Sequence, residues 1–230
     1  GKYENGRVNV ITGHSIPLGA LGVFLLWFGW FGFNGASTLA ADPELVPNVI
    51  ANTFFAAAAG VAATAFYTKF RYGHIDGSLT LNGALAGLVG ITAGAANVSI
   101  IGSLIIGLVA APFLVEGVRF LEWKLKVDDP VGAIAVHGIC GIWGTLAVGL
   151  FDIGGQGLFY GGGFGLLGIQ AIGIIATIAW VSVSVAIGLL IIKAFVPLRV
   201  TAEEEIAGLD VMEHGAPAYE FQDIFKSSAV

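Results

Sequence analysis

VDDPVGAIAVHGICGIWG, residues 127–144, places one histidine, His137, inside a long apolar stretch. Asp129 followed by Pro130 predicts a helix start, with Asp129 as N-cap and Pro130 as the first helical residue. The stretch 131–151 contains no Asp, Glu, Lys or Arg and is long enough to cross a bilayer as a helix. At about 1.5 Å per residue, His137 would lie roughly 10–12 Å beyond that start, near the middle of the bilayer.

An ionisable side chain at that depth is a functional candidate, because a charge is costly in lipid. The competing interpretation is a core histidine that is hydrogen-bonded to a neighbouring helix, and in a soluble protein that interpretation would be preferred. In a membrane we favour a functional role for His137.

Composition identifies the class of protein. Of the 230 residues, 56% are hydrophobic and 11% are charged, and the mean hydropathy is +0.86, well above the values of soluble domains. The 35 glycines favour close helix packing in a membrane. The net charge of −6 comes largely from the C-terminal tail and does not indicate a nucleic-acid partner. With one cysteine, Cys140, an internal disulfide is excluded, and we predict neither a metal site nor a cofactor.

We therefore predict an all-α polytopic membrane protein. Its six transmembrane helices are expected at about 17–41, 46–68, 78–95, 99–121, 130–151 and 164–196, between a polar segment at 1–16 and a tail at 197–230. The boundary near residue 96 is the least marked, but the uncharged stretch around it is too long for one helix. Glycines recur at helical spacing in the third span and predict a smooth packing ridge, at Gly83, Gly87, Gly90 and Gly94.

Side chains of the first two spans have simpler expected roles. We expect lipid contact and interface anchoring from most aromatic residues of the first span, namely Trp27, Trp30, Phe31 and Phe33. In the second span, Asn52 and Thr53 are expected to form hydrogen bonds between helices.

The connections between spans fall into two alternating sets. One set comprises 1–16, 69–77, 119–130 and the region from 193 onward, and the other comprises 42–45, 95–98 and 152–163. All ten Lys and Arg residues lie in the first set or at its helix ends. The positive-inside rule therefore predicts that both ends of the chain are in the cytoplasm and that the protein lies in the cytoplasmic membrane.

Several classes of function are not supported by the sequence. The glycine-rich connection 152–163 has neither the strand–helix context of a dinucleotide site nor a Walker lysine. The spans contain no activated nucleophile and no carboxylate pair, since Glu116 is alone there, so we do not predict an enzyme. The first residues are polar and do not begin with Met, so we expect a segment of a longer or processed protein rather than a secretory signal.

Four motifs, in this order along the chain, carry a family resemblance. They are GWFGFNGAS at 29–37, GALAGLVGIT at 83–92, DDPVGAIAVHGICGIWG at 128–144 and LRVTAEEEIAGLDVMEHG at 198–215. Together they resemble the ammonium transporter family (Amt/Mep/Rh), most closely its bacterial and archaeal Amt branch, over residues 12–219. Such proteins have eleven spans, made of two inverted five-helix halves and a last helix, and this chain is similar to the second half and the last helix.

The resemblance implies roles for particular residues. His137 would be one of two paired pore histidines, Phe33 one ring of a phenylalanine gate, and Ser37 part of the outer ammonium-recruiting site. It also implies a homotrimer with one pore in each subunit, and a cytoplasmic face and tail that bind a PII-type signalling protein. For that contact the tail offers Leu209, Asp210, His214, Gly215 and Tyr219.

The sequence departs from the family pattern in ways that limit the prediction. The second pore histidine of the family has no counterpart here, because the remaining histidines lie in polar loops or in the tail. We therefore expect this chain to hold half of a pore and not to conduct alone. The family also often has an acidic residue at the positions of Gly132 and Ala216, and the order FNAGS where FNGAS stands here.

Three functions remain open on sequence alone. The first is transport, in which ammonium is recruited, loses its proton and passes a hydrophobic pore lined by imidazoles, which can both donate and accept protons. The second is an ammonium sensor on the same fold, with the acidic tail as its output. The third is a channel for small neutral solutes such as water or gas.

Overall fold

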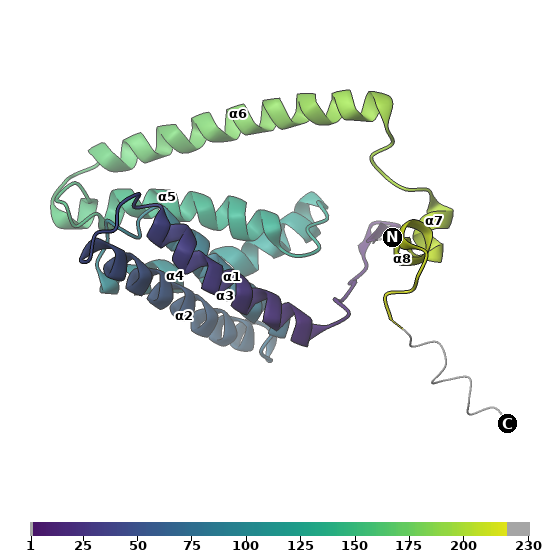
Figure 1. Cartoon of the computed structure of the whole chain (residues 1–230), viewed down its shortest axis with the longest axis horizontal. Coiled ribbons are helices and arrows are strands. Elements are labelled where there is room, and N and C mark those ends of the chain that lie inside the picture. Colours follow the sequence, from purple (N-terminus) through teal and green to yellow (C-terminus); the bar gives the residue numbers. More distant parts are fainter. Residues whose placement is uncertain (1, 220–230) are drawn as a thin grey trace. The chain divides into compact units, whose positions relative to one another are not determined.

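The computed structural model describes residues 2–219, and these are mostly helical (Figure 1). A short hairpin of β1 (Tyr3–Glu4) and β2 (Arg7–Val8) comes first. The six long apolar segments are α1 (Ile16–Ala36), α2 (Leu45–Tyr72), α3 (Gly77–Thr92), α4 (Ile100–Arg119), the π-helix η2 (Ile134–Ile139) with α5 (Cys140–Phe151), and α6 (Gly165–Phe195). The shorter helices are the π-helix η1 (Phe120–Leu125), the 3-10 helix η3 (Leu158–Tyr160), α7 (Ala202–Ala207) and α8 (Leu209–His214).

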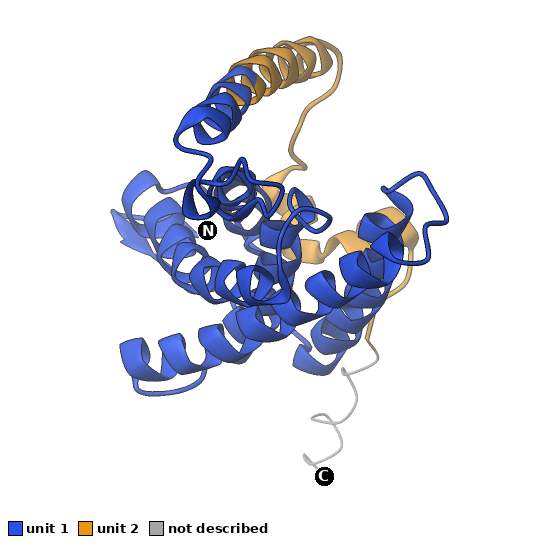
Figure 2. Ribbon diagram, turned by 90° about the vertical axis from the view of Figure 1, so that its left-hand side faces the viewer, with its two compact units in different colours: residues 1–176 blue, residues 177–230 orange. Residues whose placement is uncertain are grey.

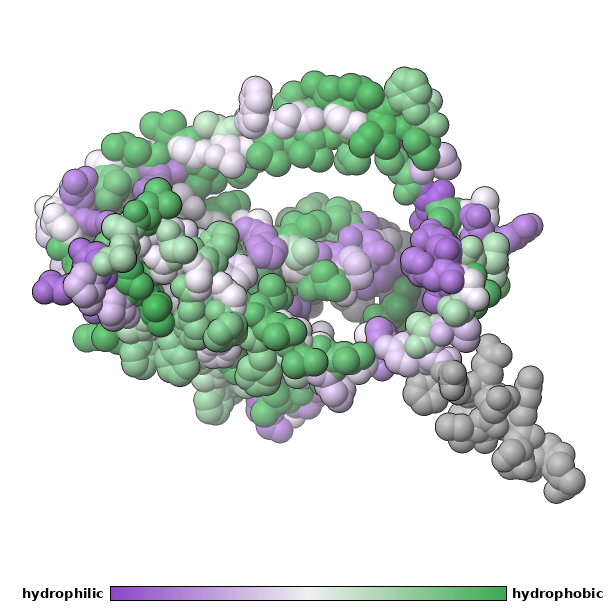
Figure 3. All heavy atoms as spheres, in the orientation of Figure 1, coloured by the Kyte–Doolittle hydropathy of each residue, from purple (hydrophilic) through white to green (hydrophobic). Residues whose placement is uncertain are grey.

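The chain forms two compact units, residues 1–176 and 177–230, which divide within α6 (Figure 2). Among the described residues, five helices are long and apolar enough to cross a membrane, and α3, with 16 residues, is a shorter apolar helix. Apolar side chains cover much of the helix surface, including α6 (Figure 3). The predicted all-α polytopic membrane fold is thus confirmed.

The observed helix ends differ from the expected ends of the spans, and local hydrogen bonds and backbone conformation explain the differences. α1 ends at Ala36 rather than near residue 41, because the Ser37 and Thr38 hydroxyls donate to the Phe33 and Gly35 carbonyls and Leu39 adopts a left-handed φ of 53°. α2 continues to Tyr72 and ends at a left-handed Gly73. The uncharged stretch after α3 breaks into turns at 93–99, so the expected interruption near residue 96 is present.

Glycines bring the central helices into backbone contact. A Cβ atom at Gly83 or Gly87 of α3 would collide with the carbonyl of Gly60 or Ala56 of α2. A Cβ atom at Gly107 of α4 would also collide with the Ala56 carbonyl. Helices in membranes associate through small residues of this kind, which allow dense van der Waals packing. Gly83 and Gly87 therefore form the packing surface that their spacing predicts, whereas Gly90 faces α4 and α5, and Gly94 lies in the turn after α3.

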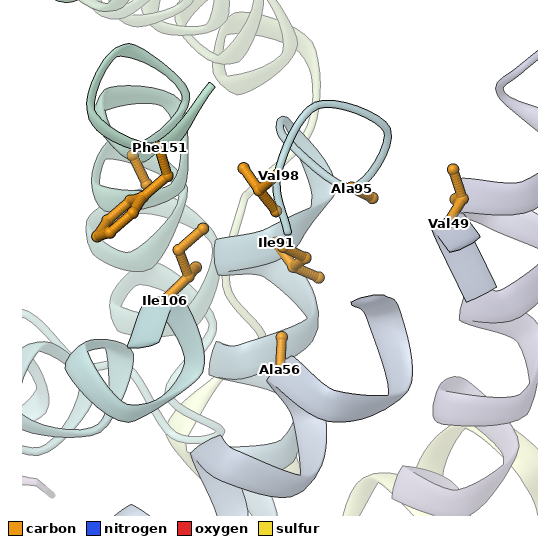
Figure 4. Close-up of a cluster of buried hydrophobic side chains, with 8 residues drawn as sticks. Val49, Ala56, Ile91, Ala95, Val98, Ile106 and Phe151 are labelled. Carbon is orange, nitrogen blue, oxygen red and sulfur yellow. The ribbon is translucent and has the colours of Figure 1, made fainter. Parts of the chain in front are cut away.

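Apolar side chains complete this packing at one end of the bundle (Figure 4). The cluster draws residues from α2, α3, the turn after α3, α4 and α5: Val49, Ala56, Ile91, Ala95, Val98, Ile106, Ala147 and Phe151. Asn52 supports it by donating to the carbonyls of Ala95 and Val98, at 2.9 and 2.8 Å. Asn52 therefore bonds to the turn after α3 rather than to another helix, whereas Thr53, the other predicted hydrogen-bonder, accepts from Asn34 of α1.

Some connections contact another member of the same predicted set. In the first set, Lys2 pairs with Glu122 at 2.8 Å, and a cavity of about 540 Å³ is lined by residues of the connections 1–16, 69–77 and 119–130. In the second set, Asn97 accepts from the Ile153 N–H at 2.9 Å and donates to Asp152 at 3.4 Å.

The tail contains two short helices that the sequence analysis does not predict. Thr201 and Glu204 form a capping box at the start of α7, and the hydrogen bonds from Thr201 hold the pKa of the Glu204 carboxyl below its ordinary value. α8 ends at Gly215, whose left-handed φ of 70° suits a residue without a Cβ atom.

Candidate functional site

The segment before His137 begins its helix later than predicted. Gly132 has a left-handed φ of 73°, which interrupts the helix expected from Pro130 onward, and regular helical structure follows only from η2. Asp129 does act as a cap, but its Oδ2 accepts from the N–H groups of Ile134 and Ala135, at 3.0 and 3.2 Å. His137 therefore lies in the first turn of its helix rather than some 10–12 Å along it.

That first turn is a π-helix, in which each N–H donates to the carbonyl five residues earlier. The Cys140 N–H, for example, donates to the Ala135 carbonyl. A π-helical turn is wider than an α-helical turn, so side chains of η2 point in different directions from those that a continuous α-helix with α5 would give them. π-helical turns are frequent at functional sites, so the local geometry supports a special role for His137.

α5 is fixed against its neighbours just beyond this turn. The Trp143 indole N–H donates to the Ile106 carbonyl of α4 at 3.0 Å, and Gly144 lies against the backbone of Gly90 in α3. Ala135 and Val136 are buried, whereas His137 is exposed within this chain. The backbone is therefore held in place while the imidazole faces outward from the packed helices.

Trp30 of α1 contacts the His137 ring. The two ring centroids are 6.4 Å apart and the planes differ by 19°, which is a stacked arrangement. Phe33, one turn further along α1, lies with its ring centroid 5.4 Å from that of Trp30. One indole thus contacts both the predicted gate ring and the predicted pore histidine, which come from separate helices.

Trp30 is also anchored to α3. Its indole N–H donates to the Thr92 hydroxyl at 2.8 Å, and that hydroxyl in turn donates to the Leu88 carbonyl at 2.7 Å. Trp30 is therefore an exception to the lipid contact expected from most aromatic residues of this span, because its polar edge is bound inside the protein and the residue is half-buried.

Phe33 and Ser37 lie on the outward side of α1. Asn34 and Gly35 are buried, and Asn34 donates to the Thr53 hydroxyl of α2 at 3.0 Å. This anchor leaves the Phe33 side chain 59% exposed. Ser37 is exposed at the C-cap of α1, where its hydroxyl donates to the Phe33 carbonyl and keeps its oxygen lone pairs available to a cation.

The tail residues belong to the second unit and form a feature of their own. The Ala218 N–H donates to Asp210 at 2.7 Å, which holds the pKa of the Asp210 carboxyl below its ordinary value and folds the chain back after α8. Two apolar members of the predicted tail set, Leu209 and Tyr219, are 42% and 44% exposed.

The side chains on this face of the chain are aromatic rings, a hydroxyl and an imidazole. No cluster of three His, Cys, Asp or Glu side chains that could hold a metal occurs within residues 2–219. Aromatic faces attract cations, a hydroxyl oxygen can accept a hydrogen bond from one, and an imidazole exchanges protons near neutral pH.

Two contributors, Trp30 and Thr92, are not predicted from the sequence. Trp30 stands three residues before Phe33 and therefore on the same helix face, which is a detectable indication. Thr92 ends the motif GALAGLVGIT, but only the packing of α1 on α3 shows what its hydroxyl binds.

Comparison with known proteins places these features in a family. The model described as Ammonium Transporter Family matches residues 1–219. Ammonium transporter Amt2 of Archaeoglobus fulgidus is 41% identical over 230 residues, an alignment that covers 95% of this chain and 49% of that protein. Ammonium transporter 1 member 1 of Arabidopsis thaliana is 37% identical, with coverages of 97% and 49%.

Solved structures agree with this relationship. The structure named Sensor Amt Protein has a TM-score of 0.86 and 40% identity, and the match covers 92% of this chain and 53% of that one. Candida albicans Mep2 has a TM-score of 0.77 and 33% identity, with coverages of 86% and 46%. This chain thus spans about half the length of the relatives it matches.

Proposed function

This chain belongs to the ammonium transporter family, and on that premise we propose that it forms one half of a membrane path for ammonium. The observation that carries the proposal is the contact of Trp30 with both Phe33 and His137. The three rings come from α1 and the helix of His137, so an aromatic gate and an imidazole would lie consecutively along one path.

In the proposed mechanism, ammonium first approaches the exposed C-terminal end of α1. The Ser37 oxygen accepts a hydrogen bond from the cation, and aromatic faces add cation–π attraction of about 1–2 kcal/mol where water is partly removed. Ammonium then separates into neutral ammonia and a proton, because an intact cation would pay a large cost in an apolar lumen. Phe33 would restrict entry to that lumen.

His137 handles the proton in this mechanism. An imidazole can accept a proton on one ring nitrogen while it donates from the other, which suits a relay. A relay across the pore needs a second imidazole facing the first. Since this chain spans about half of its relatives, we propose that the second imidazole is supplied by the half of the pore that the other part of such a protein forms.

Membership of the ammonium transporter family also supports a proposal for the assembly, the membrane and the orientation of the chain. We propose a homotrimer in the cytoplasmic membrane, with the connections that contain Lys and Arg, and both ends of the chain, in the cytoplasm. The exposed tail residues, Leu209 and Tyr219 among them, would contact a PII-type signalling protein.

Replacement of His137 tests the proposed mechanism. In the full-length protein reconstituted in liposomes, His137→Ala should lower the ammonium-evoked current at least about 100-fold or change its ion selectivity, as expected for loss of a proton-transferring group. His74→Ala is the matched control, because His74 lies in an exposed connection and should transport normally. A current of wild-type size and selectivity in His137→Ala would rule out the relay.

A sensor is the second candidate, because one close structural relative is named Sensor Amt Protein. Transport is preferred, since the family and the curated relatives described above are named for ammonium transport. Removal of residues 198–230 would favour the sensor if transport were unchanged while a cellular response to ammonium disappeared. Osmotic water flux exceeding methylammonium uptake would instead favour a channel for neutral solutes.

A further inference from the structure

We propose that Trp30 is a positioning residue whose indole, anchored to Thr92, fixes the ring orientation of His137. The inference rests on the proposed function of His137 and adds to it a contact, made within this chain, that orients the imidazole. The juxtaposition that supports it is a continuous chain of contacts from α3 through α1 to η2.

The first link is a hydroxyl with a defined orientation. The Thr92 hydroxyl has one hydrogen, which it donates to the Leu88 carbonyl at 2.7 Å. Its oxygen then presents lone pairs to the Trp30 N–H, whose nitrogen lies 2.8 Å away. Because both partners are satisfied, the plane of the Trp30 indole is defined by a hydrogen bond as well as by packing.

The second link is the stacking of the two rings. The terminal torsion of a histidine is broad, so a backbone position alone does not fix the imidazole plane. The interplanar angle of 19° and the centroid distance of 6.4 Å place the indole face along the His137 ring. Rotation of the imidazole about that torsion would break this contact.

The third point concerns competition for hydrogen bonds. Tryptophan has one N–H donor and no side-chain acceptor, and in Trp30 that donor is directed to Thr92. The indole therefore orients His137 without binding either ring nitrogen. Both nitrogens stay available to the facing imidazole of the proposed relay and to the proton, which a hydroxyl or amide neighbour would not guarantee.

A purely structural role for the Trp30–Thr92 bond, joining α1 to α3, makes a different prediction. Loss of the bond would then lower stability without changing the state of the imidazole. Positioning instead predicts an altered His137 ring and a slower maximal rate, since proton transfer depends steeply on geometry. Two variants separate these roles. Thr92→Val is isosteric and removes the acceptor, and Trp30→Phe removes the donor but keeps a smaller aromatic ring.

The experiment uses the full-length protein labelled with 15N-histidine. Thr92→Val and Trp30→Phe should each shift or broaden the His137 ring nitrogen resonances and lower the maximal ammonium-evoked current about tenfold, with the half-saturating concentration unchanged. The double variant should be no slower than the single variants, because both changes remove one interaction. Thr92→Ser, which keeps the hydroxyl, should restore both the resonances and the current.

Matched controls are Thr145→Val, whose hydroxyl donates to the Gly141 carbonyl of its own helix, and Trp180→Phe, whose side chain is exposed on α6. Unchanged His137 resonances in folded Thr92→Val and Trp30→Phe would overturn the positioning role, even if the current fell. The two proposals fail separately: if the resonances move as expected but wild-type protein carries no ammonium current, the proposed function is wrong and the positioning of His137 stands.

Discussion

Two faces of the same helical bundle are built from different side chains. Where α2, α3 and α4 meet, glycine and alanine allow backbone contact, and a single added methyl group would collide with a carbonyl. On the face formed by α1 and η2, large rings and an imidazole stand outward, with Phe33 59% exposed. The first face packs against other helices of this chain. The second face presents polar and aromatic side chains that point away from the chain.

The difference separates residues that stabilise the fold from residues that act on a solute. Small residues at the packed face contribute by having no side chain to displace, so almost any substitution there affects folding. Side chains of the open face make little buried contact within this chain, so their replacement should affect transport more than the packing of the chain. If the separation holds, substitutions should affect folding most at the packed face, less at its junction with the open face, and least at the open face and in the tail.

Gly87→Ala is the strongest test of the packed face. An alanine favours an isolated helix by about 1 kcal/mol over glycine, but here its Cβ atom would collide with the Ala56 carbonyl, whose backbone cannot move easily. We expect destabilisation of about 3 kcal/mol, measured as lower thermal stability of the detergent-purified full-length protein. Gly188→Ala on α6, which has open space around it, should be neutral or stabilising, and equal losses from both variants would contradict the packing argument.

Asp129→Ala tests the junction between the two faces. The substitution leaves the N–H groups of Ile134 and Ala135 without their carboxylate acceptor, and Ala135 is fully buried, so we expect a loss of about 2 kcal/mol. Because η2 carries His137, the ammonium current should fall as well. Asp128→Ala, at the exposed neighbouring position, is the control. If both variants were equally stable, the two hydrogen bonds would not hold η2.

The packed face is well predicted by the sequence, because its pattern is local. Helical spacing of Gly83 and Gly87 indicates a ridge whatever helix lies opposite, and charge-free stretches indicate spans through their length alone. Asp129 is likewise recognisable as a cap from its neighbours. Its true partners are displaced only because Gly132 adopts a left-handed conformation that a sequence pattern does not specify.

The open face is predicted less completely, because it depends on which helices become neighbours. Phe33 and His137 are identified through family motifs, yet the indole that contacts both is not singled out from the aromatic residues of its span, most of which are expected to contact lipid. The Trp30–Thr92 bond joins residues 62 positions apart, and no periodicity within one helix can indicate it. The π-helical turn is equally hidden, since no pattern in residues 134–139 specifies it.

Phe33→Ala probes the open face itself. Phe33 is mostly exposed and its main ring contact is with Trp30, so the loss of stability should stay below about 1 kcal/mol. The ammonium current or its selectivity against potassium should nevertheless change, because the proposed gate is removed. Phe66→Ala, at a 76% exposed position on α2, should change neither property. A marked loss of stability with normal transport in Phe33→Ala would reverse the proposed division between the faces.

The smallest effect is expected in the tail, where a charged hydrogen bond rather than packing maintains the local fold. The Ala218 N–H holds the pKa of Asp210 below its ordinary value of 3.8, so the bond adds stability that is fully present above that pH. This contribution is lost as the pH falls further, through the lowered pKa of the folded tail. The Ala218 amide chemical shift should therefore titrate below pH 3.8 in wild-type protein and in Glu213→Gln, and should not titrate in Asp210→Asn. A titration that persists in Asp210→Asn would mean that another group orders the turn after α8. Its loss would show that one carboxylate orders this turn, without the close glycine packing that holds α2, α3 and α4 together.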